Sequence, residues 1–97
     1  MRGAGWYYVY ILRSMKNDSI YIGCTGDITK RFDEHIKGLN RSTLRMLPLE
    51  IIYVEVFKSK KDAFLREKRL KQHGSALRNL KSRLRCTLRK LGEPSPS

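Results

Sequence analysis

Residues 6–23 read WYYVYILRSMKNDSIYIG and contain two short segments rich in aromatic and β-branched residues. In the first, residues 6–12, side chains alternate between two sides of an extended chain, which predicts a β-strand. The polar run 14–18 ends in Asn-Asp, a pair typical of turns. Residues 19–23 supply a second short strand. Together the two segments predict a β-hairpin.

The register of this hairpin follows from its aliphatic residues, because a slip of one residue would move every side chain to the opposite face. Two pairs keep these residues on one face: Val9 with Ile22, and Ile11 with Ile20. The same register places Tyr10 and Tyr21 side by side on the other face, near Trp6 and Tyr8. We therefore expect two neighbouring tyrosines on one surface of the sheet.

Residues 27–38 have the pattern of a short helix. Asp27 is a good N-cap, and Gly38 is a good residue to end the helix after about residue 37. The predicted buried stripe consists of Ile28, Phe32, Ile36 and Leu39. Arg31 and His35 are four positions apart, so they share a face at the edge of that stripe rather than on the solvent side.

One further strand completes the predicted sheet. Residues 40–48 are irregular and end in a proline, and residues 50–57 (EIIYVEVF) form the strongest predicted strand in the chain. Both faces of this strand are apolar, so we place it beside the hairpin. The expected fold class is α/β (α+β): a three-stranded antiparallel sheet flanked by helices, in the order β-β-α-β-α-α.

Two helices are expected after the third strand. The first runs from Lys60 to about Gln72, with Ser59 as its N-cap and Asp62 as the capping-box partner. Gly74 ends it. A basic, weakly amphipathic helix then runs from Ser75 to about Lys90.

The chain has 97 residues, enough for one domain with a modest core. We expect residues 1–91 to form that domain and residues 92–97 to be a disordered tail. The sequence has neither an apolar run long enough to cross a bilayer nor a signal-peptide pattern, so we expect a cytoplasmic protein that does not bind membranes. Cys24 and Cys86 match no metal-binding spacing, which predicts free thiols in a reducing compartment.

Charge is distributed unevenly. The chain carries 21 Lys and Arg against 9 Asp and Glu, a net charge of +12, and residues 58–90 alone have a net charge of +11. Clustered cations gain free energy by releasing counterions from phosphates, so a nucleic acid is the favoured partner. A solvated basic face or a membrane-surface patch is the alternative, but residues 58–90 lack the strong apolar face of an interfacial helix.

In the predicted helix 60–72, the apolar side consists of Ala63, Phe64 and Leu70. Glu67 lies inside this stripe, four residues after Ala63 and three before Leu70. A carboxylate in that position is costly unless it is paired or bound to a metal. An ion pair with Lys71 is one explanation. Coordination of a hard divalent cation such as Mg²⁺ is another, and the position alone favours neither.

Three other kinds of side chain suit phosphate chemistry. Arg31 can donate two parallel hydrogen bonds to a phosphate, and His35 can exchange a proton near neutral pH. A tyrosine hydroxyl can position a water molecule or take part in proton transfer. Each of these residues taken alone also has an ordinary structural explanation, either as a half-buried strand aromatic or as a histidine at a core edge.

The combination resembles the GIY-YIG nuclease superfamily. Val9-Tyr10-Ile11 stands where that family has its first tripeptide, and Tyr21-Ile22-Gly23 is the second. Arg31 and His35 match the arginine and histidine of the following helix, and Glu67 matches the metal-binding glutamate. The compact layout is most similar to the small, stand-alone bacterial branch.

The resemblance covers roughly residues 6–85 and implies a metal-dependent endonuclease that hydrolyses phosphodiester bonds, with DNA favoured over RNA. It implies that Glu67 holds a single Mg²⁺ or Mn²⁺ and that Arg31 stabilises the pentacovalent phosphate. A tyrosine, Tyr10 or Tyr21, would activate the attacking water, with proton transfer assisted by the histidine. The predicted nucleic-acid contacts are Lys30, Lys71, Asn79, Lys81, Arg83 and Arg85.

Two alternative functions stay open. The chain could be a binding module that holds DNA or RNA and cuts poorly, or only with a protein partner that supplies specificity. A ribosome-associated RNA-binding protein would explain the charge but not Glu67 in an apolar stripe. Metal-dependent cleavage separates the nuclease from both alternatives.

Overall fold

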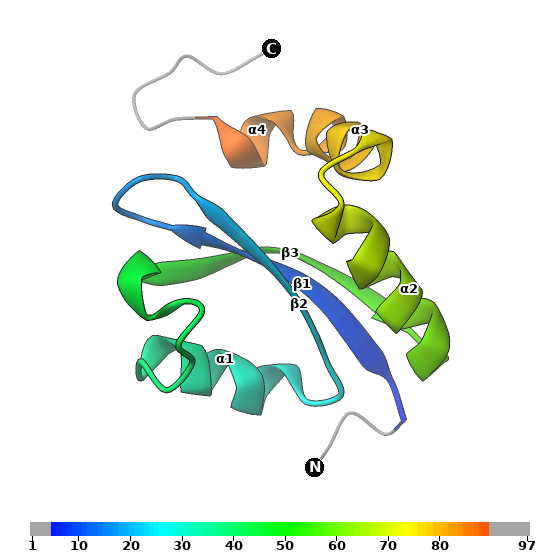
Figure 1. Ribbon diagram of the computed structural model, residues 1–97, viewed down its shortest axis with the longest axis horizontal. Helices are drawn as coiled ribbons and strands as arrows, with labels where there is room; N and C mark the ends of the chain where they lie inside the picture. The colour runs from blue at the N-terminus through cyan, green and yellow to red at the C-terminus, as the bar shows by residue number, and fades with distance from the viewer. Residues whose placement is uncertain (1–4, 90–97) are drawn as a thin grey trace.

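The computed structural model describes residues 5–89, which form a three-stranded antiparallel sheet and its covering helices (Figure 1). The strands are β1 (Tyr7–Ser14), β2 (Ile20–Thr25) and β3 (Leu49–Phe57), and β1 lies between the other two. The helices are α1 (Ile28–Ile36), the 3-10 turn η1 (Leu44–Met46), α2 (Lys60–Lys71), α3 (Ser75–Arg83) and α4 (Arg85–Leu88). The predicted fold class is confirmed. The tail predicted at residues 92–97 lies outside the described residues.

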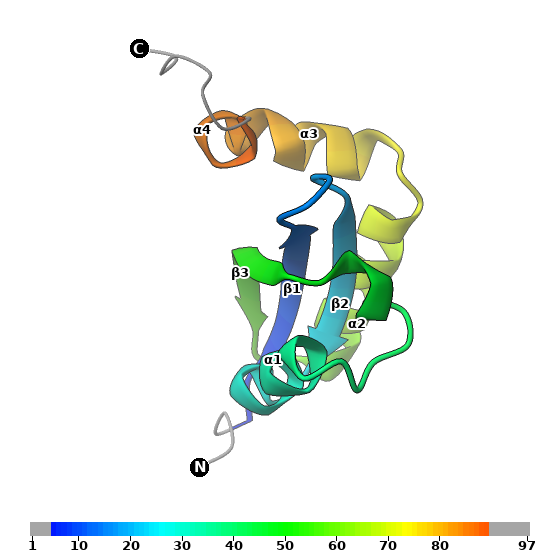
Figure 2. The same ribbon diagram turned by 90° about the vertical axis from the view of Figure 1, so that its left-hand side faces the viewer.

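Helices cover both faces of the sheet (Figure 2). On one face, Val9 and Ile11 of β1 pack in a core with apolar residues of α2 and α3. On the other, Tyr10 and Leu12 pack against residues of α1 and the segment before β3. Alternation along β1 therefore assigns its odd-numbered residues to one layer and its even-numbered residues to the other. Among the described residues, no helix has the length and apolar character needed to span a membrane.

The hairpin register differs from the prediction by two residues. Ile11 lies opposite Ile22, whereas the sequence pattern paired Val9 with that isoleucine. The shift preserves both faces, because side chains alternate with a period of two. Its physical reason is the contact between Tyr10 and Gly23, which face each other: a Cβ at position 23 would collide with the tyrosine ring and hydroxyl. The glycine therefore gives the ring its space. It also belongs to β2, which continues to Thr25, two residues beyond the end of the predicted strand.

Both predicted N-caps are present. The Asp27 carboxylate accepts a hydrogen bond from the backbone N–H of Lys30 at 3.1 Å. The Ser59 hydroxyl accepts one from the N–H of Asp62 at 3.2 Å. Gly38 adopts φ +75°, the left-handed conformation that ends α1.

The buried stripe predicted for α1 is wrong in its second half. Ile36 is 46% exposed and Leu39 is 71% exposed, whereas His35 is fully buried. The reason is the rotation of α1, which places Phe32 and His35 against the sheet. Hydrophobic spacing alone did not specify this rotation, because a polar residue occupies a core position.

The predicted long C-terminal helix is interrupted at Leu84, which has φ −108° and ψ 29° and lies between α3 and α4. Leu84 is partly buried against the α2–α3 core. The Arg13 side chain also donates a hydrogen bond at 2.8 Å to the carbonyl of Thr87, and it pairs with Glu50 of β3. These contacts draw the segment back onto the sheet, so the chain turns instead of continuing straight.

Candidate active site

Three aromatic rings pack together on the α1 face of the sheet. The Tyr10 ring centroid lies 6.5 Å from that of Tyr21, and the His35 ring lies 5.8 Å from the first tyrosine and 5.3 Å from the second. The Tyr10 hydroxyl is 2.9 Å from Nε2 of His35, within hydrogen-bond distance. The structure thus brings together the two tyrosines as the alternation predicted. Trp6 lies elsewhere, exposed at the end of the sheet, with the Lys58 ammonium 4.9 Å from its ring centroid.

His35 also has a partner that the sequence did not reveal. Its Nδ1 lies 2.7 Å from the hydroxyl of Thr43, the residue before η1, and both side chains are fully buried. A buried histidine needs partners for both ring nitrogens. The signal in the sequence was therefore only indirect: a small polar residue in the irregular segment that follows the histidine.

Arg31 lies on the open side of this ring cluster. Its guanidinium pairs with Glu34 at 3.1 Å and its side chain stays partly exposed. Burial raises the pKa of Tyr10 to about 12, and the hydrogen-bonding Arg31 cation opposes that rise. Burial lowers the pKa of His35, and the same cation lowers it further, so the imidazole is neutral at pH 7. A partly exposed guanidinium, a tyrosine hydroxyl and a neutral imidazole therefore lie next to one another.

Glu67 approaches from α2, on the other side of the sheet. Its neighbours Ala63 and Leu70 are fully buried as predicted, whereas Phe64, which was also assigned to the apolar stripe, is 57% exposed. Only 15% of the Glu67 side chain is exposed, and its carboxylate pairs with Lys71 at 3.2 Å. It lies close enough to raise the pKa of both Tyr10 and Cys24. Lys71 connects this carboxylate to the ring cluster, because its ammonium also lies 5.9 Å from the Tyr21 ring centroid.

β2 is an edge strand, and the site wraps around that edge. Tyr21 projects from β2 toward α1, while the Lys71 ammonium from α2 lies 5.9 Å from the centroid of the same ring. Between the two sides stands Gly23, whose lack of a side chain lets the Tyr10 ring reach over the strand. Residues from both sheet faces thus meet at one edge. This brings together all five residues that the sequence singled out for chemistry: Tyr10, Tyr21, Arg31, His35 and Glu67.

A clamp of hydrogen bonds between α2 and β3 fixes how α2 is rotated. Arg66 donates two hydrogen bonds of 2.8 Å to the carboxylate of Glu55 on β3, and Tyr53 donates a third at 2.7 Å. Burial raises the pKa of Glu55, but these hydrogen bonds outweigh burial and hold it below its usual value. Successive helix residues point about 100° apart. Tying Arg66 to β3 therefore turns its neighbour Glu67 toward β2. Sequence analysis missed this clamp, because its partners come from distant segments.

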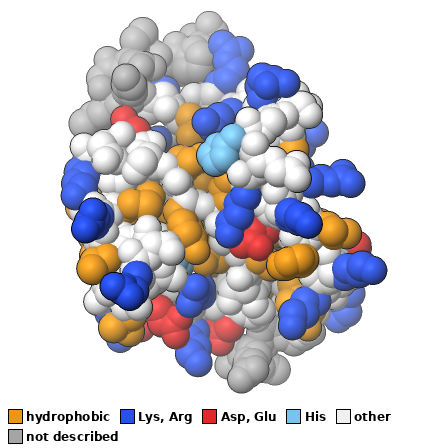
Figure 3. All heavy atoms as spheres, viewed as in Figure 1, with side chains coloured by type: hydrophobic (Ala, Val, Ile, Leu, Met, Phe, Trp, Pro, Cys, Tyr) orange, Lys and Arg blue, Asp and Glu red, His pale blue; other side chains and the backbone are white. Residues whose placement is uncertain are grey.

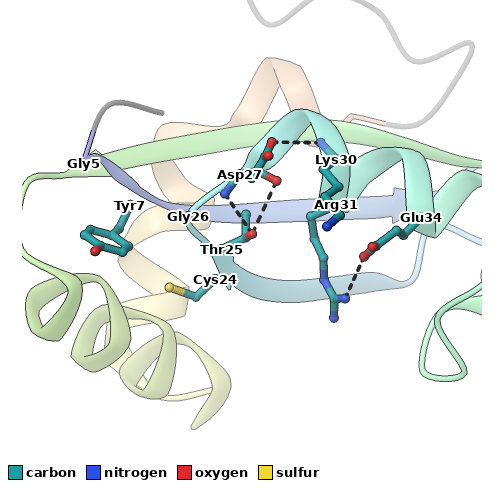
Figure 4. A pocket seen from close by; sticks show the side chains of 9 residues that line it. All are labelled: Gly5, Tyr7, Cys24, Thr25, Gly26, Asp27, Lys30, Arg31 and Glu34. Atoms are coloured by element: carbon teal, nitrogen blue, oxygen red, sulfur yellow. Dashed lines mark hydrogen bonds and ion pairs between the residues drawn. The ribbon is translucent and has the colours of Figure 1, made fainter. Parts of the chain in front are cut away.

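A cavity of about 550 Å³ opens beside the cluster (Figure 4). Tyr7 and Cys24 lie at one end, while Arg31 and Glu34 lie at the other. The predicted contact residue Lys30 also lines it. The cavity is large enough to receive part of a nucleotide next to the arginine.

The remaining predicted nucleic-acid contacts lie on the outer surface of α3 and α4. Asn79, Lys81, Arg83 and Arg85 are all exposed. Among residues 5–89, no contact joins Asn79 to the ring cluster, and its carbonyl accepts a hydrogen bond from Ser82. Figure 3 shows lysines and arginines gathered on the side of the molecule that carries α2 and α3. The structure thus separates a compact cluster from a broad basic surface.

The donor set around Glu67 fits one kind of metal. Within the described part of the chain, no group of three or more His, Cys, Asp or Glu side chains could hold an ion. The described residues therefore contain no structural zinc site, which would need four protein ligands. Mg²⁺ is commonly held by one or two carboxylates, with water and substrate phosphate completing the shell. A single, half-buried carboxylate beside an arginine and two tyrosines is compatible with that arrangement.

Comparisons with known proteins agree with the geometry. Residues 6–82 match the family model described as the GIY-YIG catalytic domain. A UPF0213 protein of Pseudomonas aeruginosa is 34% identical over 91 residues, which cover 90% of this chain and 84% of the relative. A UPF0213 protein of Clostridium perfringens is 36% identical, and the match covers 67% of this chain and 70% of the relative. One of Oceanobacillus iheyensis is 37% identical, and the match covers 68% of this chain and 77% of the relative. No solved structure matches the chain.

Proposed function

The chain belongs to the GIY-YIG family of nuclease domains, and on that premise we propose that it is an endonuclease that needs a divalent cation and hydrolyses phosphodiester bonds, with DNA favoured over RNA. One observation carries the proposal: Glu67 from one face of the sheet and the Tyr10–His35–Arg31 cluster from the other meet at the β2 edge. We also propose that residues 1–91 form a single domain.

The protein's own residues have distinct tasks in this proposal. Arg31 donates hydrogen bonds to non-bridging phosphate oxygens and stabilises the charge that develops on them. Tyr10 and Tyr21 orient the attacking water, and the raised pKa of Tyr10 keeps its hydroxyl protonated until a nearby cation favours the phenolate. His35 is neutral and holds the Tyr10 oxygen in place.

Glu67 is the residue that would hold the cation, Mg²⁺ or Mn²⁺. When bound, such a cation neutralises charge on the phosphate and on the leaving oxygen. The Arg66 clamp supports this role because it turns the Glu67 carboxylate toward the cluster. Lys71, already paired with Glu67, would release it on cation binding and become free to contact a neighbouring phosphate.

The basic surface would hold the rest of the substrate. We propose that Lys30 contacts phosphate beside the cavity, and that Asn79, Lys81, Arg83 and Arg85 follow the backbone farther away. Contacts of this kind add affinity without reading base sequence. The distance of α3 from the cluster is a reason to assign Asn79 to this surface rather than to the reacting phosphate.

A second candidate, a non-catalytic nucleic-acid-binding module, is favoured by one observation. Glu67 already has a cationic partner in Lys71, so its place in the apolar stripe is explained without any metal. In that case, the protein would act only by binding nucleic acid through its basic surface.

A cleavage assay with matched variants separates the two. The substrates are single-stranded, duplex and branched DNA and RNA, each incubated with Mg²⁺, with Mn²⁺ or with EDTA. Glu67→Gln should abolish cation-dependent cleavage while leaving affinity unchanged or higher, because it removes a negative charge near the phosphate. Asp62→Asn removes the same charge from an exposed position on α2 and should cleave like the wild type. Full cleavage by a folded Glu67→Gln variant would rule out the metal assignment, and no cleavage of any substrate would favour the binding module.

A further inference from the structure

A continuous hydrogen-bonded chain runs from Thr43 through His35 to Tyr10. The Thr43 hydroxyl lies 2.7 Å from Nδ1 of the imidazole, and Nε2 lies 2.9 Å from the Tyr10 hydroxyl. None of the three side chains is more than 1% exposed. A neutral imidazole carries one donor and one acceptor nitrogen, so the two hydrogen bonds must point the same way along the chain. Either Thr43 donates toward Tyr10, or Tyr10 donates toward Thr43.

Thr43 decides the direction. Within residues 5–89, its hydroxyl contacts no hydrogen-bond partner other than His35, and its backbone groups are already paired with Asn40 and Met46. If Nδ1–H donated to the hydroxyl, the hydroxyl proton would be buried without an acceptor, which folded proteins avoid. If the hydroxyl donates to Nδ1, the proton left without a protein acceptor is that of Tyr10, which lies at the other end of the chain, beside the partly exposed Arg31.

The other end of the chain is consistent with this direction. Arg31 interacts with the Tyr10 hydroxyl and can only donate. With Nε2–H donating, the Tyr10 oxygen accepts a hydrogen bond from His35 while it lies beside the Arg31 cation. Its own proton then has no protein acceptor among the described residues, but the neighbouring Arg31 is partly exposed, so water or substrate can accept the proton at this end of the chain.

We propose that Thr43 is a positioning residue: its hydroxyl donates to Nδ1 of His35, holds the imidazole as the Nε2–H tautomer, and thereby turns the Tyr10 hydroxyl proton away from the protein and toward the substrate. His35 is then a hydrogen-bond donor to Tyr10 and not the acceptor of its proton. The proton arrangement stands on the buried geometry alone. Its consequence for catalysis rests on the proposed nuclease function.

The tautomer can be read directly by long-range ¹H–¹⁵N NMR of the histidine side chains in the uniformly labelled protein at pH 7.5. We expect the His35 signals of a protonated Nε2 and an unprotonated Nδ1. His73, which is exposed, serves as a reference within the same spectrum. A wild-type spectrum with the proton on Nδ1 would overturn the proposal, whatever the protein cleaves.

Two variants test whether Thr43 is the cause. Thr43→Val keeps the shape and removes the hydroxyl, so the Nε2–H population should fall; Thr43→Ser keeps the hydroxyl and should preserve the wild-type tautomer. In a cleavage assay, kcat should fall about 10- to 100-fold in Thr43→Val with KM little changed, and the serine variant should recover most of it. An unchanged tautomer in folded Thr43→Val would contradict the assignment.

The readouts keep two failures apart. If no substrate is cleaved by the wild type, the proposed function fails while the wild-type NMR spectrum still decides the tautomer. If cleavage is present and His35 carries its proton on Nδ1, only the role of Thr43 fails. Should Thr43→Val not fold, the wild-type and Thr43→Ser spectra together remain decisive.

Discussion

The two faces of the sheet are built from alternating residues of the same strand and differ in kind. Toward α2 and α3, β1 contributes Val9 and Ile11 to a core whose fully buried members are all apolar. Toward α1, it contributes Tyr10, and the buried neighbours there include His35 and Thr43. Burying an apolar layer stabilises the fold, whereas burying a polar layer destabilises it unless every polar group has a hydrogen-bond partner. The difference indicates that the interior of the α2 face serves stability, whereas the buried polar groups of the α1 face form the Tyr10–His35 part of the candidate site.

The largest stability effect should come from the apolar face. Leu70→Ala removes a fully buried side chain of α2 and should lower the free energy of unfolding by about 2–5 kcal/mol. Urea denaturation measures the loss, and cleavage per folded molecule should be retained. Leu65→Ala, at an exposed position of the same helix, should change stability by only about 0.5 kcal/mol. A loss of cleavage in the folded fraction of Leu70→Ala would contradict the division between the faces.

The reverse pattern is expected for Arg31. Arg31→Gln should reduce kcat about 10²–10³-fold, because a preorganised donor to the developing phosphate charge is lost. Stability should change little, since the ion pair with Glu34 that is broken is partly exposed. Arg41→Gln makes the same change in net charge at an exposed site and serves as the control. Equal losses in both variants would mean that Arg31 contributes only general attraction to the substrate.

Gly23 tests the point where the two faces meet. A methyl group at this position would collide with the Tyr10 ring, so Gly23→Ala should cost about 1–3 kcal/mol of stability and displace the tyrosine. Thermal unfolding gives the stability, and the Tyr10 ring signals in an NMR spectrum report the displacement. Gly74→Ala is the matched control, because its new Cβ would meet no atom within 4 Å. Indistinguishable behaviour of the two variants would refute the close approach of Tyr10 to β2.

A smaller effect is expected on the pH dependence of stability. The pKa of His35 is lowered in the folded state, so the unfolded chain binds the proton more readily. The free energy of unfolding should therefore hold above about pH 6.5 and decline as the pH falls below it, by at most about 1.4 kcal/mol per pH unit. His35→Gln should remove this decline, and His73→Gln should keep it. A decline that persists in His35→Gln would assign it to other groups.

Alternation and capping residues were enough to predict most of the fold. Both tyrosines were correctly placed on one face, because a register error of two residues leaves every strand side chain on the same face of the sheet. Asp27 and Ser59 act locally, so their effect is visible in the sequence. What could not be predicted depends on distant partners. The rotation of α1 depends on the hydrogen bond between His35 and Tyr10, which are 25 positions apart in the sequence.

The candidate site shows the same limit. Residue types and spacing, together with the resemblance to the GIY-YIG superfamily, singled out the five chemical residues, but the residues that support them were not predicted. Thr43 supports the site because it hydrogen-bonds the buried His35. Arg66 supports it because it pairs with Glu55 of β3. Such supports depend on three-dimensional packing, which a hydrophobic pattern does not encode.

The most direct test of the central claim is where Mn²⁺ binds. The claim is that Glu67 from one face and the tyrosines from the other form one site at the β2 edge. Substoichiometric Mn²⁺, a paramagnetic ion, should broaden NMR signals most strongly at Gly23, Glu67 and the rings of Tyr10 and Tyr21, and this pattern should vanish in Glu67→Gln and persist in Asp62→Asn. Broadening centred on other acidic residues, or an unchanged pattern in Glu67→Gln, would contradict the account.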